Sequence, residues 1–172
     1  MGARVGPASP ERIGRYELGT LFATQQSIRI CRSNPTPHFS GTCSFPAGQS
    51  VTITAANGHF HSRGRSFQVY SWDGVSDQQP ADSARFYVSD RWDDPPMERG
   101  LTTQPPSGGG IWWTCDFTWS EPSVGCDAVN LADRQMGNDC CYTFGAKVEL
   151  NEHCNVFAYF WPKVARGDIN CF

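Results

Sequence analysis

Eight cysteines in a chain of 172 residues constrain this fold more than any other feature of the sequence. Their number is even, as disulfide pairing requires, and such cysteine usage is typical of an oxidising compartment. A chain of this length buries a hydrophobic core without covalent help, so the bridges add to a core. We therefore expect a secreted, extracellular domain in which every cysteine is paired: Cys31, Cys43, Cys115, Cys126, Cys140, Cys141, Cys154 and Cys171.

The spacing of the cysteines suggests a simple partition of the bridges. Cys31 and Cys43 flank a proline-rich turn, so a bridge between them would staple a hairpin, and three further bridges would join the six cysteines from 115 to 171. Fifteen connectivities of those six remain open. The adjacent pair Cys140–Cys141 is the only close pair, and no C-x2-C spacing exists, so a cysteine-bound zinc is not expected.

Short segments with a period of two in hydrophobicity, separated by turn signals, predict an all-β fold. Ile111 to Trp119 alternates cleanly, whereas Val156 to Trp161 is apolar on both faces, as in a central strand. Only residues 127–136 show helical spacing. Further strands are expected at 27–31, 42–45, 51–54, 67–72, 85–88 and 142–150, and the turn signal Asn57–Gly58 is expected to join 51–54 to 67–72 as a pair of strands. The predicted fold is an antiparallel β-sandwich or barrel with one short helix, stapled by disulfides.

Composition suggests where the domain begins and how it is divided. Residues 1–14 lack an apolar pattern and are expected to form a disordered tail, leaving residues 15–172 as one β-rich domain. The Gly- and Pro-rich stretch 100–110 is expected to be a loop, which would join two lobes at 15–99 and 111–172.

Several function classes are disfavoured by charge and by missing motifs. The net charge of −3 is not the basic footprint of a nucleic-acid-binding protein. No apolar run is long enough for a membrane span. Phosphate loops, dinucleotide fingerprints, HExxH and Gly-x-Ser-x-Gly motifs are absent, and paired cysteines leave no thiol nucleophile. We expect no cofactor, and the sequence does not indicate an oligomeric state.

An acidic segment around Trp92 is the first candidate binding site. Asp90, Asp93 and Asp94 surround this ring, and carboxylates beside an exposed aromatic side chain suit a sugar ligand. Trp112 falls on the polar face of its predicted strand and is expected to be exposed as well. Together these five residues form the predicted carbohydrate site.

Histidines and glutamates provide weaker candidates. His59 and His61 lie on one face of an extended segment and could chelate a divalent metal, but the sequence does not identify a third ligand, so no metal site is predicted. Glu149 and Glu152 near His153 could act as acid and base in a small hydrolase of the glycosidase or ribonuclease kind.

Three likenesses to known groups can be stated. Residues 28–54 resemble one Greek-key motif of the βγ-crystallin family, with Phe39-Ser40-Gly41 in the aromatic-x-Gly position, and the order of the last six cysteines resembles inhibitor-knot and hevein-type modules. Neither the crystallin likeness nor the likeness in cysteine order implies a function for this chain. The general profile is similar to secreted, cysteine-rich effectors and toxins as a class. We therefore expect a non-enzymatic protein that binds a protein partner, with a carbohydrate-binding, lectin-like module and a small secreted hydrolase as alternatives.

Overall fold

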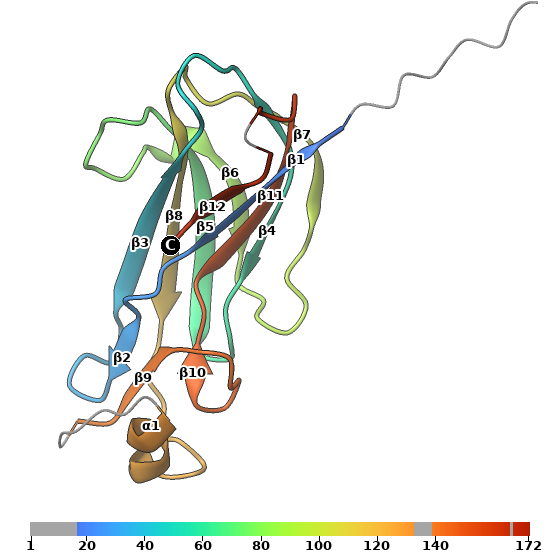
Figure 1. The fold of residues 1–172 in the computed structure, drawn as a ribbon. Helices are drawn as coiled ribbons and strands as arrows, with labels where there is room; N and C mark the ends of the chain where they lie inside the picture. Colours follow the sequence, from blue (N-terminus) through green and yellow to red (C-terminus); the bar gives the residue numbers. More distant parts are fainter. Residues whose placement is uncertain (1–16, 133–138, 166) are drawn as a thin grey trace, which may run out of the picture.

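Two β-sheets packed face to face form the body of the protein in a computed structural model (Figure 1). The structure describes residues 17–132, 139–165 and 167–172. The expected tail at 1–14 lies outside the described residues, as do residues 133–136 of the expected helix. Within the described part, no helix is both long and apolar enough to cross a membrane.

The first sheet has five strands in the order β12-β1-β11-β4-β7. All neighbours pair in the antiparallel direction except β1 and β12, which are parallel. Its strands are β1 (Gly19–Thr24), β4 (Thr52–His59), β7 (Glu98–Thr103), β11 (Asn155–Trp161) and β12 (Ile169–Cys171). The prediction of a central strand at 156–161 is confirmed, because β11 lies between β1 and β4.

The second sheet has four antiparallel strands in the order β3-β8-β5-β6. They are β3 (His38–Ser44), β5 (Gly64–Trp72), β6 (Arg85–Ser89) and β8 (Gly110–Phe117), with a short 3-10 helix at Asp82–Ala84 before β6. The alternation predicted for β8 is confirmed: its odd-numbered side chains from Ile111 to Phe117 are buried between the sheets. Together with Phe60, Phe67 and Phe160 they form the aromatic-rich core.

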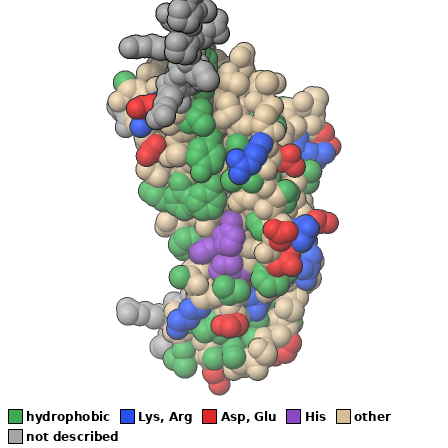
Figure 2. All heavy atoms as spheres, turned by 90° about the vertical axis from the view of Figure 1, so that its right-hand side faces the viewer, with side chains coloured by type: hydrophobic (Ala, Val, Ile, Leu, Met, Phe, Trp, Pro, Cys, Tyr) green, Lys and Arg blue, Asp and Glu red, His purple; other side chains and the backbone are tan. Residues whose placement is uncertain are grey.

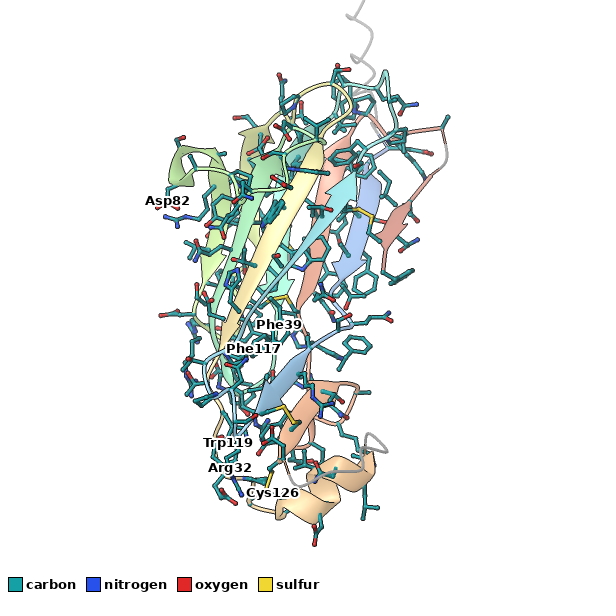
Figure 3. All side chains as sticks on the ribbon, turned by 90° about the vertical axis from the view of Figure 1, so that its left-hand side faces the viewer. Arg32, Phe39, Asp82, Phe117, Trp119 and Cys126 are labelled. Atoms are coloured by element: carbon teal, nitrogen blue, oxygen red, sulfur yellow. A yellow bond between two sulfur atoms is a disulfide. The ribbon has the colours of Figure 1, made fainter. Side chains whose placement is uncertain are left out.

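A smaller layer closes one end of the sandwich. It contains β2 (Arg29–Cys31), β9 (Cys141–Phe144), β10 (Asn151–Glu152) and the helix α1 (Cys126–Ala132). Figure 3 shows this end, where the Arg32 guanidinium lies 5.3 Å from the centre of the Trp119 ring. One short helix, as expected, is therefore present among the described residues.

Three of the four disulfides join residues at least 39 positions apart, and the expected partition into a Cys31–Cys43 bridge and three bridges within 115–171 is wrong. The pairs are Cys31–Cys141, Cys43–Cys171, Cys115–Cys154 and Cys126–Cys140, and all eight cysteines are used. The hairpin that the bridge would have stapled does not form, because β2 pairs with β9 while β3 pairs with β8. For the same reason residues 28–54 are not one Greek-key unit.

Two other local expectations are corrected by packing. Asn57–Gly58 is not a turn: β4 continues to His59, and Gly58 is required because an added Cβ would lie 2.3 Å from the Phe67 ring. β4 and β5 consequently belong to different sheets. The strand expected at 142–150 ends at Phe144, and the following residues form a turn in which the Leu150 amide donates to the Lys147 carbonyl.

Both sheets combine strands from the two halves of the chain. β11 lies between β1 and β4, and β8 lies between β3 and β5. Residues 100–103, expected in a loop, belong to β7, so the connection to β8 is short. The two sequence halves are thus interleaved rather than side by side.

Candidate metal centre

Three histidines from two distant segments converge at the end of β4. His59 is the last residue of β4, His61 follows in the turn toward β5, and His153 lies between β10 and β11. The pairing of His59 with Asn155 on β11 places the connection before Asn155 beside the histidine pair. The sheet register therefore brings a third histidine to the pair, which the sequence pattern alone did not identify.

The distances within this histidine cluster, defined as His59, His61 and His153, are short. One ring nitrogen from each side chain lies within 4.8 Å of the others. The ring centres are 5.3 Å apart for His59–His61, 5.3 Å for His59–His153 and 4.4 Å for His61–His153. A tetrahedral ion with bonds of about 2.1 Å needs its ligand nitrogens about 3.4 Å apart. The observed separations of up to 4.8 Å are as much as about 1.4 Å longer than this, so a bound ion would require the rings to move closer together.

Hydrogen bonding determines which nitrogen His61 can offer. Its Nδ1 lies 2.8 Å from the Asn151 carbonyl oxygen. A carbonyl only accepts, so Nδ1 carries the proton and donates, which leaves the lone pair on Nε2. A carbonyl bonded to the second ring nitrogen is the usual support of a metal-binding histidine.

His153 carries a buried ring nitrogen without a partner among the described residues. Its Nδ1 is inaccessible to solvent and makes no hydrogen bond. The ring packs against Phe144, with 5.1 Å between the ring centres. A buried polar atom without a partner destabilises the fold unless a further group satisfies it, and a metal ion is one such group.

A buried ion pair holds the turn that carries His61. The fully buried Glu152 carboxylate accepts hydrogen bonds from the His61 amide at 2.8 Å and the Arg63 amide at 3.1 Å. It also forms a salt bridge of 3.2 Å with Nη1 of Arg63. The Arg63 guanidinium in turn lies 3.4 Å from the centre of the Tyr142 ring. Glu152, the residue before His153, therefore fixes the backbone of the turn from His61 to Arg63.

Burial is the main effect that lowers the pKa of all three imidazoles, which favours their neutral form. Burial lowers the pKa of His59 and His61, and for His59 the neighbouring His61 lowers it further. Burial, with repulsion from His61 and His59, lowers the pKa of His153 to about 4. Burial raises the pKa of Glu152 to about 7, against the opposing effect of Arg63 and the two amides. Neutral imidazole is the form that binds metals.

The cluster reaches the molecular surface beside an apolar band. Figure 2 shows the histidines on one face, with hydrophobic side chains next to them. His59 and His153 are half-buried, so part of each ring is open to solvent. The outward side chains Phe157, Tyr159 and Trp161 of β11 are exposed, and the β4–β11 register places His59 on the same face as Phe157.

The residues of the predicted carbohydrate site lie apart from this cluster. Asp90, Asp93 and Asp94 are exposed with Trp92 in the connection between β6 and β7, where Arg91 forms an ion pair with Asp94. Trp112 lies on β8 and packs against Trp72, with ring centres 6.4 Å apart. It is half-buried. No contact between Trp92 and Trp112 is found among the described residues, and the carbohydrate site remains a prediction.

The carboxylates considered for hydrolysis have different environments. Glu149 is exposed, as its polar strand position suggested, although it lies in a turn. Glu152 is fully buried, and both of its oxygens accept hydrogen bonds from His61 and Arg63. Both carboxylate oxygens of Glu152 are therefore already engaged in hydrogen bonds that support the histidine cluster.

No protein-family model matches the chain, and no curated protein matches it.

Proposed function

We propose that this protein binds a divalent transition-metal ion through His59, His61 and His153. The observation that carries the proposal is the convergence of three ring nitrogens within 4.8 Å of one another. Support comes from the His61 tautomer, from the buried Nδ1 of His153 and from the lowered pKa values of all three rings.

A ligand set of three imidazoles is suited to zinc or copper. Neither thiolate nor carboxylate belongs to the set, so ions that prefer oxygen, such as Ca²⁺ and Mg²⁺, fit poorly. A tetrahedral ion held by three side chains keeps its fourth position for water or another small ligand. The half-exposed rings of His59 and His153 would leave that position accessible from solvent.

The four disulfides fit an extracellular protein, and we propose secretion as its setting. Binding of a protein partner, in the manner of an effector or toxin, remains a prediction from the sequence. A metal centre is compatible with that role and does not depend on it.

Calorimetric titration of Zn²⁺ and Cu²⁺ into chelator-treated, oxidised protein tests the proposal. We expect one ion per chain, and His153→Ala should weaken binding by at least about 100-fold, beyond the range of outer-shell changes. His38→Ala is the matched control, because this fourth histidine lies on β3 and pairs with Asp116 at 2.6 Å.

Circular dichroism before each titration confirms that the variants are folded. Equal binding by wild type and by the His59→Ala and His153→Ala variants would contradict the proposal. So would absence of binding in the wild type for both ions.

A further inference from the structure

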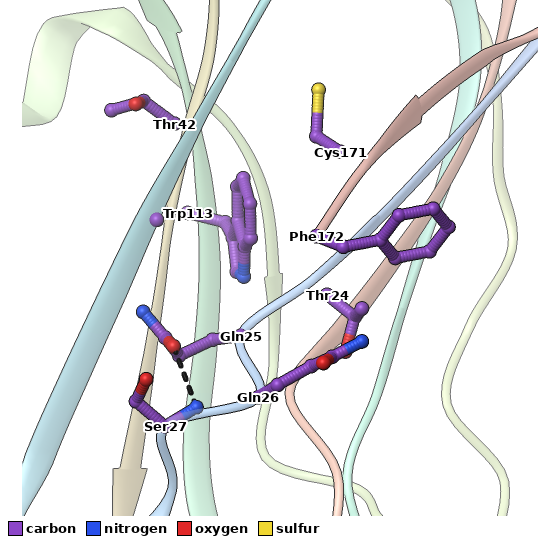
Figure 4. Close-up of a pocket in the computed structure, with 9 residues that line it drawn as sticks. Thr24, Gln25, Gln26, Ser27, Thr42, Trp113, Cys171 and Phe172 are labelled. Atoms are coloured by element: carbon purple, nitrogen blue, oxygen red, sulfur yellow. Dashed lines mark hydrogen bonds between the residues drawn. The ribbon is translucent and has the colours of Figure 1, made fainter.

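An open cleft lies at one edge of the sandwich, away from the histidine cluster. β3 and β12 are the edge strands of their sheets on this side, and the disulfide Cys43–Cys171 joins them. Beside this bridge the chain leaves β1 at Thr24 and crosses toward β2, which opens a space of about 360 Å³ between the sheets (Figure 4). Small-molecule sites have volumes of about 300–1,000 Å³.

The side chains that line the cleft carry no charge, and they combine polar groups with the exposed ring of Phe172. Two amides, Gln25 and Gln26, and the hydroxyl of Ser27 lie on one side, and Thr42 lies on the other. No Asp, Glu, Lys, Arg or His side chain is found among the described residues that line it. A charged ligand would lose its hydration here without gaining a counter-charge, so the cleft favours a neutral ligand.

The Gln25 amide is held in a fixed orientation. Its Nε2 donates to the Ser40 carbonyl at 2.6 Å, and its Oε1 accepts from the Ser27 amide at 2.8 Å, the bond drawn in Figure 4. An amide has two N–H groups and two lone pairs, so one donor and one acceptor position remain for a ligand. A group that is already ordered loses little entropy when it binds.

An aromatic ring lies at the inner end of the cleft. Trp113 projects from β8 toward the space, and its Nε1 donates to the Cys154 carbonyl at 3.3 Å, which fixes the ring. Gly41 on β3 makes room for it, because an added Cβ would lie 2.4 Å from the indole. The absence of a side chain at position 41 therefore allows the indole to pack against β3.

We propose that this cleft binds a neutral saccharide, as a short oligosaccharide or the end of a longer chain. Saccharides combine hydroxyl groups, which pair with amides and hydroxyls, with an apolar C–H surface that packs against aromatic rings. The amides and hydroxyls of the cleft provide the first kind of contact, and the exposed Phe172 ring that lines it provides the second, while Trp113 is buried behind them. This site is separate from the acidic segment around Trp92 and independent of the metal centre.

Chemical-shift mapping with ¹⁵N-labelled protein tests this site. The probes are cellotriose, xylotriose, maltotriose, mannotriose and N,N′,N″-triacetylchitotriose, each added to millimolar concentration. We expect at least one probe to cause saturable shifts of the Ser27 and Thr42 amides and of the Trp113 indole N–H. Gln26→Trp, which fills the opening from an exposed position, should abolish these shifts.

Gln104→Ala serves as the control, because Gln104 is exposed, lies outside the cleft and bonds only to the Thr52 hydroxyl. It should bind the probe as wild type does. The proposal is overturned if no probe shifts these resonances, or if the shifts map to Trp92 or Trp112 and survive Gln26→Trp.

Discussion

Two arginine–carboxylate pairs of nearly equal length show how differently the histidine cluster and the acidic segment are built. Arg63–Glu152 is 3.2 Å long with both side chains almost completely buried, whereas Arg91–Asp94 is 3.3 Å long with both side chains largely in water. In the first pair, the Glu152 carboxylate also accepts hydrogen bonds from the backbone amides of His61 and Arg63, which hold the turn that carries His61. Distance alone therefore says little about what an ion pair contributes; burial and additional hydrogen bonds decide it.

The same contrast applies to the groups that could bind a ligand. The acidic residues 90, 93 and 94 are neighbours in sequence, yet each lies exposed in a connection between strands. His153 is separated from His59 and His61 by about half of the chain, yet one nitrogen from each ring lies within 4.8 Å of the others. Convergence from distant segments onto a rigid sheet is a better indication of a site than clustering along the sequence.

The largest effect is expected at the buried pair. Glu152→Ala should lower the free energy of unfolding by about 3–5 kcal/mol, because it leaves the Arg63 charge buried without its partner. Asp94→Ala should change it by less than about 1 kcal/mol. Urea unfolding of the oxidised variants measures both values, and similar losses for the two variants would break the comparison.

Metal binding should stabilise the folded protein by a somewhat smaller amount. A free ion concentration of 100 times the Kd contributes about 2.7 kcal/mol, because only the folded state holds the three rings together. We expect the gain in wild type and in His38→Ala but not in His59→Ala. Thermal unfolding with and without Zn²⁺ gives the shift in Tm, and an equal shift in all three proteins would argue for nonspecific binding.

Neutralising the acidic segment should leave metal binding unchanged. The triple variant Asp90→Asn, Asp93→Asn, Asp94→Asn removes charges that are exposed and screened by salt. We expect its affinity for Zn²⁺ to stay within about twofold of wild type at physiological salt. A large loss of affinity would show that the ion is bound at the acidic segment instead.

A modest effect on stability is expected where the acidic segment is attached to the sandwich. The buried Tyr87 hydroxyl donates to the Pro96 carbonyl at 3.0 Å, and Tyr87→Phe should cost about 0.5–1.5 kcal/mol of unfolding free energy. Burial raises the pKa of Tyr87, so the folded state favours the neutral phenol. The stabilisation that follows from this raised pKa is fully present below about pH 10, the pKa of an unfolded tyrosine. It is lost as the pH rises through the folded pKa.

Unfolding measurements at several alkaline pH values compare wild type with Tyr87→Phe. Stability of wild type should fall more steeply above about pH 10 than that of the variant. If the unfolding free energies of the two proteins change in parallel with pH, the role given to the Tyr87 hydroxyl is contradicted.

The β-rich class, several strands and the complete pairing of the cysteines were predictable from local patterns. The alternation from Ile111 to Phe117 and the apolar run at 156–161 each correspond to a strand. The pairing of strands and the pairing of cysteines were not predictable, because local sequence patterns do not show which distant segments come together. The Cys31–Cys141 bridge and the His153 contribution both depend on long-range register.

For the same reason, only two of the three histidines of the candidate site could be linked to each other from the sequence. The pattern of His59 and His61 indicates a possible chelating pair, but the third histidine lies 92 residues beyond His61. From the sequence, His153 is only a possible acid–base group beside two glutamates. Its position between β10 and β11 could be recognised as relevant only once β11 was paired with β4.

The most direct test of the central claim follows the imidazole nitrogens themselves. Long-range ¹H–¹⁵N spectra of the oxidised protein at pH 7.5 are recorded while Zn²⁺ is added to one equivalent. We predict that ring resonances of His59, His61 and His153 shift together and stop changing at one equivalent, while those of His38 stay in place. Shifts of all four histidines, or of none, would contradict a metal centre built by these three residues.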